Sequence, residues 1–135
     1  MSSTSTNEAQ NIAVIRRGYE AFSKGDIETL KTLFSPNATW RQPEMGVLKG
    51  DYKGIPAILQ FFGQLAQETQ GSQHVEIQAI AASGDQVFVW ERFTAKRKGQ
   101  TADTMEVQLF KLENGIVTEV INFQSDYPTV AKFWS

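Results

Sequence analysis

Aromatic and polar side chains are mixed on a short predicted strand, residues 37–42. The segment Trp40-Arg41-Gln42 follows the helix stop Ser35-Pro36-Asn37 and ends before Pro43. A large aromatic ring beside polar side chains on a strand is typical of a pocket wall. We therefore expect Trp40 and Gln42 to face a binding site.

Two later predicted strands carry carboxyl groups among apolar residues. Side chains alternate between the two faces of a strand, so Glu91 and Phe93 share one face of strand 87–96. In the same way Glu106, Gln108 and Phe110 share one face of strand 103–112. Paired carboxyl groups can act as general acid and base, provided that the two faces meet in one cavity.

Cysteine and histidine, the residues most often used as nucleophiles and metal ligands, are nearly absent from the chain. The chain has no cysteine, which excludes disulfides, thiolate metal sites and cysteine nucleophiles. Its single histidine leaves no imidazole cluster for zinc, whereas magnesium or calcium bound by carboxylates stays open. We predict no metal site, and no cofactor is implied.

Charge and hydropathy limit the possible partners. The net charge is -2 with no long run of one sign, which favours neither nucleic acid nor an anionic membrane as a partner. The cluster Lys96-Arg97-Lys98-Gly99 is predicted to be a solvated hairpin turn. No stretch approaches the roughly 20 apolar residues of a membrane span, and the Ser/Thr-rich start is unlike a signal peptide. We expect a cytoplasmic protein.

Length and periodicity predict one domain. With 135 residues the chain can build a single core, over residues 8–135, preceded by a disordered polar tail over residues 1–7. Apolar residues at helical spacing predict helices at 8–24, 26–34 and 54–69. Alternating runs then predict strands at 37–42, 74–80, 87–96, 103–112 and 116–124, and a short closing helix within 126–135. Helices followed by antiparallel strands predict an α+β fold, with helices packed on a curved, mostly antiparallel sheet.

The order of these elements resembles the SnoaL-like polyketide cyclase and ketosteroid isomerase group, within the cone-shaped nuclear-transport-factor-2-like superfamily. The resemblance covers residues 11–134. The residues that carry it are Phe22-Ser23-Lys24-Gly25-Asp26, Leu33 to Trp40, Gly50 with Tyr52 and Gly54, Phe61-Phe62, and Asn114-Gly115-Ile116-Val117. These are mostly caps, turns and core residues, so the resemblance implies the fold and not a reaction.

The three catalytic positions of the isomerase differ in this chain. The position of its general-base aspartate is Gln42, and an amide does not shuttle a proton at neutral pH. The position of its oxyanion-hole tyrosine is Gly18, next to Tyr19, and that of its neutral aspartic acid is Gln108. Steroid isomerisation by that mechanism is therefore not expected.

The same comparison turns Glu91 and Glu106 inward on neighbouring strands. They would then face a largely apolar cavity, where two like charges cannot both ionise freely. The structural alternative is that Glu91 pairs with Arg41 or Arg92 or lines the solvent rim, and that Gln42 and Gln108 bond to each other or to buried backbone groups.

A further acid, Asp126, follows the last strand where SnoaL-like enzymes place an acid near the cavity mouth. The alternative is that it caps the closing helix. The expected catalytic residues are thus Glu91, Glu106 and Asp126. The expected ligand-binding residues are Tyr19, Trp40, Gln42, Phe93, Gln108, Phe110 and Phe123.

These residues suggest a protein that binds a small, mostly apolar organic molecule and acts on it as an isomerase, cyclase or hydrolase by acid-base chemistry. The alternative is a ligand-binding or protein-interaction module without catalysis. We also expect a homodimer through the outer face of the sheet. The resemblance implies it, and Val107 and Leu109 make that face more apolar than a solvent-facing sheet usually is.

Overall fold

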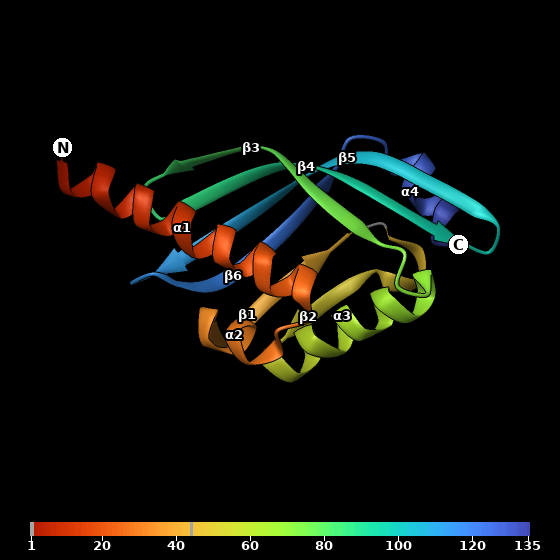
Figure 1. The fold of residues 1–135 in the computed structure, drawn as a ribbon, viewed down its shortest axis with the longest axis horizontal. Helices are drawn as coiled ribbons and strands as arrows, with labels where there is room; N and C mark the ends of the chain where they lie inside the picture. Colours follow the sequence, from red (N-terminus) through yellow and green to blue (C-terminus); the bar gives the residue numbers. More distant parts are fainter. Residues whose placement is uncertain (1, 44) are drawn as a thin grey trace.

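The computed structural model describes residues 2–43 and 45–135, and it has the predicted α+β architecture (Figure 1). The helices are α1 (Ser2–Lys24), α2 (Ile27–Leu33), α3 (Ile55–Thr69) and α4 (Tyr127–Phe133), with a 3-10 turn at Gly46–Leu48. The strands are β1 (Phe34–Gln42), β2 (Gly50–Lys53), β3 (His74–Ser83), β4 (Gln86–Arg97), β5 (Gln100–Glu113) and β6 (Ile116–Gln124).

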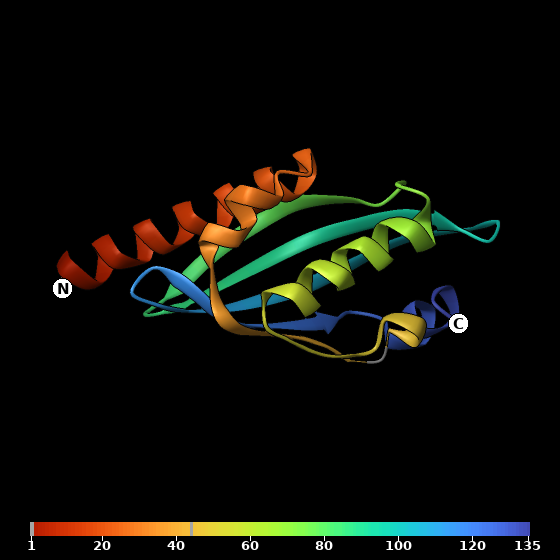
Figure 2. The same ribbon diagram turned by 90° about the horizontal axis from the view of Figure 1, so that it is seen from below.

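The strands form one curved sheet in the order β2-β1-β6-β5-β4-β3. Neighbouring strands are antiparallel except β1 and β6, which are parallel. Helix α1 packs against β3 and β4, and α3 packs against β1, β2 and β4, so these helices cover the inner face of the sheet (Figure 2). Helix α4 packs against β5 and the 3-10 turn, near one end of the sheet. The inner face therefore becomes the wall of an enclosed space.

Caps explain the α1–α2 junction as predicted. Gly25 has a φ of +68°, a left-handed conformation that favours glycine at a helix C-terminus. Asp26 then caps α2, because its Oδ1 accepts a hydrogen bond of 3.1 Å from the backbone N–H of Thr29. Helix α1 begins at Ser2, six residues before the predicted start. Disorder of residues 1–7 in solution stays a prediction.

The prediction missed strand β2. Residues 50–53 pair with β1 in antiparallel register, with Tyr52 opposite Trp40, whereas the sequence pointed to a loop punctuated by Gly46, Gly50 and Gly54. A strand of four residues is too short for alternation to be detected. The Tyr52 hydroxyl donates a hydrogen bond of 2.7 Å to the carbonyl oxygen of Leu48, which fixes the loop against the strand.

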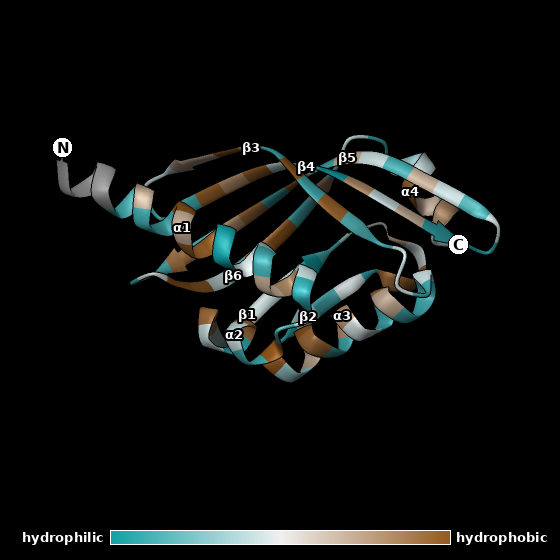
Figure 3. Cartoon of the chain, viewed as in Figure 1, coloured by the Kyte–Doolittle hydropathy of each residue, from teal (hydrophilic) through white to brown (hydrophobic). Residues whose placement is uncertain are grey.

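The core lies between the helices and the inner face of the sheet. Hydrophobic bands run along the strands and along α3 (Figure 3). Trp40 is its centre, because its ring packs against Phe34, Phe61, Phe62 and Phe110. This cluster joins β1, α3 and β5, and it forms the apolar surroundings of the site described next.

Candidate acid-base site

Two carboxyl groups face each other inside the sheet. Glu91 on β4 lies directly opposite Glu106 on β5 in the antiparallel register. Both are buried, with exposed fractions of 1% and 5%. Residues directly opposite on neighbouring strands are close enough for their side chains to interact, so the pair forms one site.

Tyr19 on α1 completes this site from the helical side. Its hydroxyl donates a hydrogen bond of 2.5 Å to Oε1 of Glu91. The ring packs edge-on against Phe110 at a centroid distance of 5.9 Å, which holds the hydroxyl in place. Tyr19 was expected as an apolar wall, and the structure adds a polar contact.

Burial determines the protonation of this cluster. The pKa of Glu91 lies well above its usual value of 4.5, first because burial disfavours the charged form and then because of the hydrogen bond and the charge of Glu106. The hydrogen bond from Tyr19 acts in the opposite direction and lowers the Glu91 pKa. The pKa of Tyr19 is raised well above 10 by burial and by the neighbouring charge of Glu91. The pair therefore retains a proton on Glu91 at pH values where an exposed glutamic acid has lost it.

A row of side-chain amides extends the polar site across β5 and β6. The Gln124 amide donates a hydrogen bond of 2.7 Å to Oε1 of Glu106 and one of 2.5 Å to Oδ1 of Asn122. The Asn122 amide in turn donates a hydrogen bond of 3.2 Å to Oε1 of Gln108. Each of these side chains is at least nine-tenths buried. A buried network of this kind holds its members in fixed orientations.

Gln42 lies at the neighbouring strand end. Its Oε1 accepts a hydrogen bond of 2.7 Å from the indole N–H of Trp40. Since the oxygen of Gln42 and that of Gln108 both accept protein hydrogen bonds, the donor end of each amide is the end offered to a ligand. The alternative in which Gln42 and Gln108 bond to each other is not what the structure contains.

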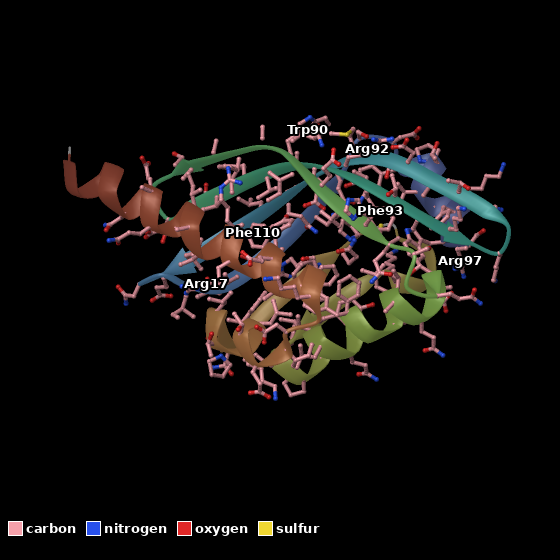
Figure 4. The ribbon with its side chains drawn as sticks, viewed as in Figure 1. Arg17, Trp90, Arg92, Phe93, Arg97 and Phe110 are labelled. Carbon is pink, nitrogen blue, oxygen red and sulfur yellow. The ribbon has the colours of Figure 1, made fainter. Side chains whose placement is uncertain are left out.

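The carboxyl pair and the two glutamines line one internal cavity of about 90 Å³. Its other walls are apolar and come from α1, α2, α3 and the sheet. Eight of the ten residues predicted from sequence line this cavity, and they are Tyr19, Trp40, Gln42, Glu91, Phe93, Glu106, Gln108 and Phe110. Figure 4 shows Phe93 and Phe110 on the helical side of the sheet, whereas Trp90 and Arg92 point away from it.

The predicted position of Phe123 is wrong. It was expected on the cavity wall, but it lies on the outer face of the sheet with 45% of its surface exposed, opposite Val107. The residues that take its place inside are Asn122 and Gln124, which the sequence analysis did not select.

A β-bulge explains this error. An unbroken register from the Asn114-Gly115 turn would place Phe123 opposite Glu106, but the register shifts between Lys111 and Leu112. The shift by one residue turns Gln124 inward and Phe123 outward. The alternation of β6 separates its side chains into two groups, one on each face of the sheet. The bulge decides which of the two groups faces the cavity.

Asp126 is likewise not part of the carboxyl site. Its exposed side chain caps α4 by accepting a hydrogen bond of 3.2 Å from the Thr129 backbone N–H, together with one of 2.6 Å from the Thr129 hydroxyl. These hydrogen bonds lower the pKa of Asp126. Of the two roles considered, helix capping is the one present in the structure.

The arginines expected as alternative partners of Glu91 bind elsewhere. Arg41 pairs with Asp51 and Glu119, and Arg92 pairs with Asp103 on the outer face. Among the described residues the Glu91 carboxyl group therefore has the Tyr19 hydroxyl as a hydrogen-bond donor and no arginine partner.

Within residues 2–43 and 45–135, His, Cys, Asp and Glu side chains form no group of three or more that could hold a metal ion. In the same residues no helix has both the length and the apolarity needed to cross a membrane.

The cone of helices on a curved sheet, with polar groups at the inner wall, places the chain among the nuclear-transport-factor-2-like folds. A SnoaL-like domain matches residues 15–120, so the protein belongs to the SnoaL-like family. The resemblance seen in the sequence is thus confirmed.

Related proteins agree on the fold. The structure of Bal32a from a soil-derived mobile gene cassette is 35% identical, with a TM-score of 0.91 over 95% of this chain and 98% of that one. A putative SnoaL-like polyketide cyclase from Jannaschia sp. CCS1 is 20% identical, with a TM-score of 0.77 over 95% and 94% of the two chains. An uncharacterised protein of Mycobacterium tuberculosis H37Rv is 26% identical over 126 residues, which are 93% of this chain and 96% of the relative.

Proposed function

We propose that the protein binds a small, mostly apolar organic carbonyl compound in the internal cavity and transfers a proton at the carbon next to its carbonyl group. The observation that carries this proposal is the Glu91–Glu106 pair, buried among apolar walls and free of any arginine partner in the described residues. SnoaL-like proteins generally bind small organic ligands, which supports the class of ligand.

The two carboxyl groups have different roles in this proposal. Glu106 takes a proton from the carbon, and the electron pair of the broken C–H bond moves into the carbonyl group to form an enolate. Glu91, which keeps its proton, donates a hydrogen bond to the enolate oxygen together with the amides of Gln42 and Gln108. Where a carbon–carbon double bond is conjugated with the enolate, return of the proton from Glu106 to the far end of that system gives the isomer. Attack of the enolate on a second carbonyl carbon of the same molecule gives an aldol-type ring, whose alkoxide oxygen takes the proton from Glu106. Dehydration and hydrolysis belong to the same acid-base chemistry.

Exchange of carbon-bound hydrogen tests the proposal without knowledge of the natural substrate. The probe is 2-tetralone in D2O, a bicyclic ketone with acidic hydrogens next to its carbonyl group, followed by proton NMR. We expect the protein to accelerate deuterium incorporation above the buffer rate, and Glu106→Gln to lower this acceleration by about 100-fold or more.

The control is Glu113→Gln, which changes an exposed glutamate in the β5–β6 hairpin and is expected to leave the rate unchanged. Equal rates with wild type and Glu106→Gln would rule out Glu106 as the base.

The second candidate is a binding protein without catalysis. It is favoured by the residues at the three catalytic positions of the isomerase, which in this chain are Gly18, Gln42 and Gln108. Binding of 2-tetralone without any accelerated exchange would select this function.

We further propose that the protein works as a cytoplasmic homodimer through the outer face of the sheet. The exposed rings of Phe88, Trp90 and Phe123 lie on this face beside Val107 and Leu109. An exposed apolar face of neighbouring strands is typical of a surface covered by a second copy.

A further inference from the structure

A second pocket lies beside the carboxyl site, between α4 and the first half of β5. Its volume is about 380 Å³, larger than that of the inner cavity. Three residues, Met45, Phe93 and Glu106, line both spaces, so the two spaces meet at these side chains. A molecule in either space therefore reaches the same Glu106 side chain.

The two spaces differ in chemistry. The inner cavity is walled mainly by rings and aliphatic side chains, whereas the second pocket includes Thr101, Thr104 and Gln124. The second pocket is therefore suited to the polar end of a ligand, and the inner cavity to an apolar body.

Gln124 indicates which polar group fits. Its amide nitrogen donates to Glu106 and Asn122, which uses both hydrogens and fixes the orientation of the amide. Its carbonyl oxygen Oε1 is buried and has no hydrogen-bond partner among the described residues, although the side chain is more than nine-tenths buried. Buried acceptors are normally paired, so we expect this oxygen to accept from a donor outside the described residues.

We propose that the ligand spans both spaces, with an apolar ring system in the inner cavity and a hydroxyl group in the second pocket that donates to Oε1 of Gln124. The inference rests on the proposed function, because it assigns the chemical class of the ligand for the same site. It selects hydroxylated carbocycles such as phenols or enols over hydrocarbons of the same size.

The three tryptophans of the chain allow a direct test by NMR of the indole N–H groups. Trp40 lines the inner cavity, Trp134 lines the second pocket, and Trp90 lies on the outer face with 41% exposure. The probes are 2-naphthol and 2-methoxynaphthalene, which share the ring system but differ in the donor. We expect 2-naphthol to shift the Trp40 and Trp134 signals and not that of Trp90, and to bind about fivefold more tightly than the methyl ether, since a net hydrogen bond contributes about 1 kcal/mol.

Two variants test where the hydroxyl group of the ligand binds. Gln124→Met removes the acceptor at similar size and is expected to abolish the preference for 2-naphthol while the methyl ether still binds. Ala102→Leu narrows the second pocket without changing any amide, and it is expected to remove the Trp134 shift and the preference. Circular dichroism checks the folding of both, and Ala102→Leu decides if Gln124→Met does not fold.

The outcomes separate this inference from the proposed function. A shift of Trp40 alone, with equal affinity for the two probes, overturns the two-pocket ligand but leaves the inner cavity as the binding site. Shifts of neither Trp40 nor Trp134 by either probe overturn both. A preference for 2-naphthol that survives Ala102→Leu also overturns the inference.

Discussion

The Glu91 carboxyl group lies opposite a second carboxyl group and accepts a hydrogen bond from a tyrosine. This arrangement makes the stability of the fold depend on pH. The Glu91 pKa is higher in the folded protein than in the unfolded chain, so the folded state binds more protons between the two pKa values. The stabilisation is complete below the unfolded pKa, near 4.5, and it is lost as pH rises through the folded pKa.

Glu91→Gln is therefore expected to stabilise the protein at high pH. A glutamine can still accept the hydrogen bond from Tyr19, but it never ionises. At pH 9 we expect the variant to gain about 1.4 kcal/mol of unfolding free energy for each unit by which the Glu91 pKa is raised, and no such gain at pH 4. Urea denaturation at both pH values measures this, with Glu113→Gln as the exposed control. The same difference at both pH values would contradict a buried, protonated Glu91.

Residue-scale features were predictable where one rule was enough. Strand alternation grouped Glu91 with Phe93, and Glu106 with Gln108 and Phe110, and the family resemblance turned both groups inward. The hydroxyl of Tyr19 was beyond such rules, because its contact with Glu91 depends on how α1 crosses β4. Asn122 and Gln124 were not predicted for a similar reason, because the bulge in the β5–β6 pairing decides which way they point.

At the scale of elements, the 3-10 turn and the end of α4 are in close contact. A Cβ atom built on Gly46 would lie 2.5 Å from the carbonyl oxygen of Trp134, and the neighbouring Val47 donates a backbone hydrogen bond to that same oxygen. Arg97 holds the same region from β4, because its buried guanidinium donates to the carbonyl oxygens of Phe133 and Ser135 and pairs with Glu68. These contacts fix α4 beside the second pocket.

Gly46→Ala is expected to loosen the contact between the 3-10 turn and the end of α4. Both Gly46 and Gly99 have a positive φ, but a Cβ on Gly99 would meet nothing within 4 Å, so Gly99→Ala is the matched control for backbone strain. We expect Gly46→Ala to lower the unfolding free energy by about 1–3 kcal/mol more than the control, the usual cost of overpacking. Equal losses in denaturant unfolding would show that the contact with Trp134 adjusts without cost.

Prediction from sequence was accurate for the elements with strong periodicity. The limits of α3 and β6 and both caps of the α1–α2 junction agree with expectation. The cluster Lys96-Arg97-Lys98-Gly99 was predicted as a solvated turn, yet Arg97 is buried, with 5% of its surface exposed. Its partners Phe133 and Ser135 are far along the chain, so no local pattern contains that information.

At the scale of the whole molecule, the proposed dimer depends on the outer face of the sheet. Trp90, Val107 and Phe123 lie opposite one another on three neighbouring strands, β4, β5 and β6. This row places apolar surface at the centre of the sheet, where a second copy could cover it.

If the proposed dimer forms, Trp90→Glu is expected to convert it into a monomer, because a charge in the middle of the proposed interface would be buried without a partner. Sedimentation velocity at micromolar concentration measures the change. Ile27→Glu is the control, since it places the same charge at an exposed apolar residue on α2. A wild-type protein that sediments as a monomer at this concentration would exclude the dimer.

The parallel pairing of β1 with β6 has a consequence for how the protein is made. The first strand of the chain finds one of its two neighbours in the last strand, with Trp40 beside Val120. On the ribosome, β1 and the helices around it must wait until β6 has been synthesised before the sheet can close. Contacts between distant parts of a chain form slowly, because loop closure costs entropy before the contact is gained. The nascent chain therefore exposes its aromatic core throughout synthesis, and this interval is when it is most open to aggregation and to binding by chaperones.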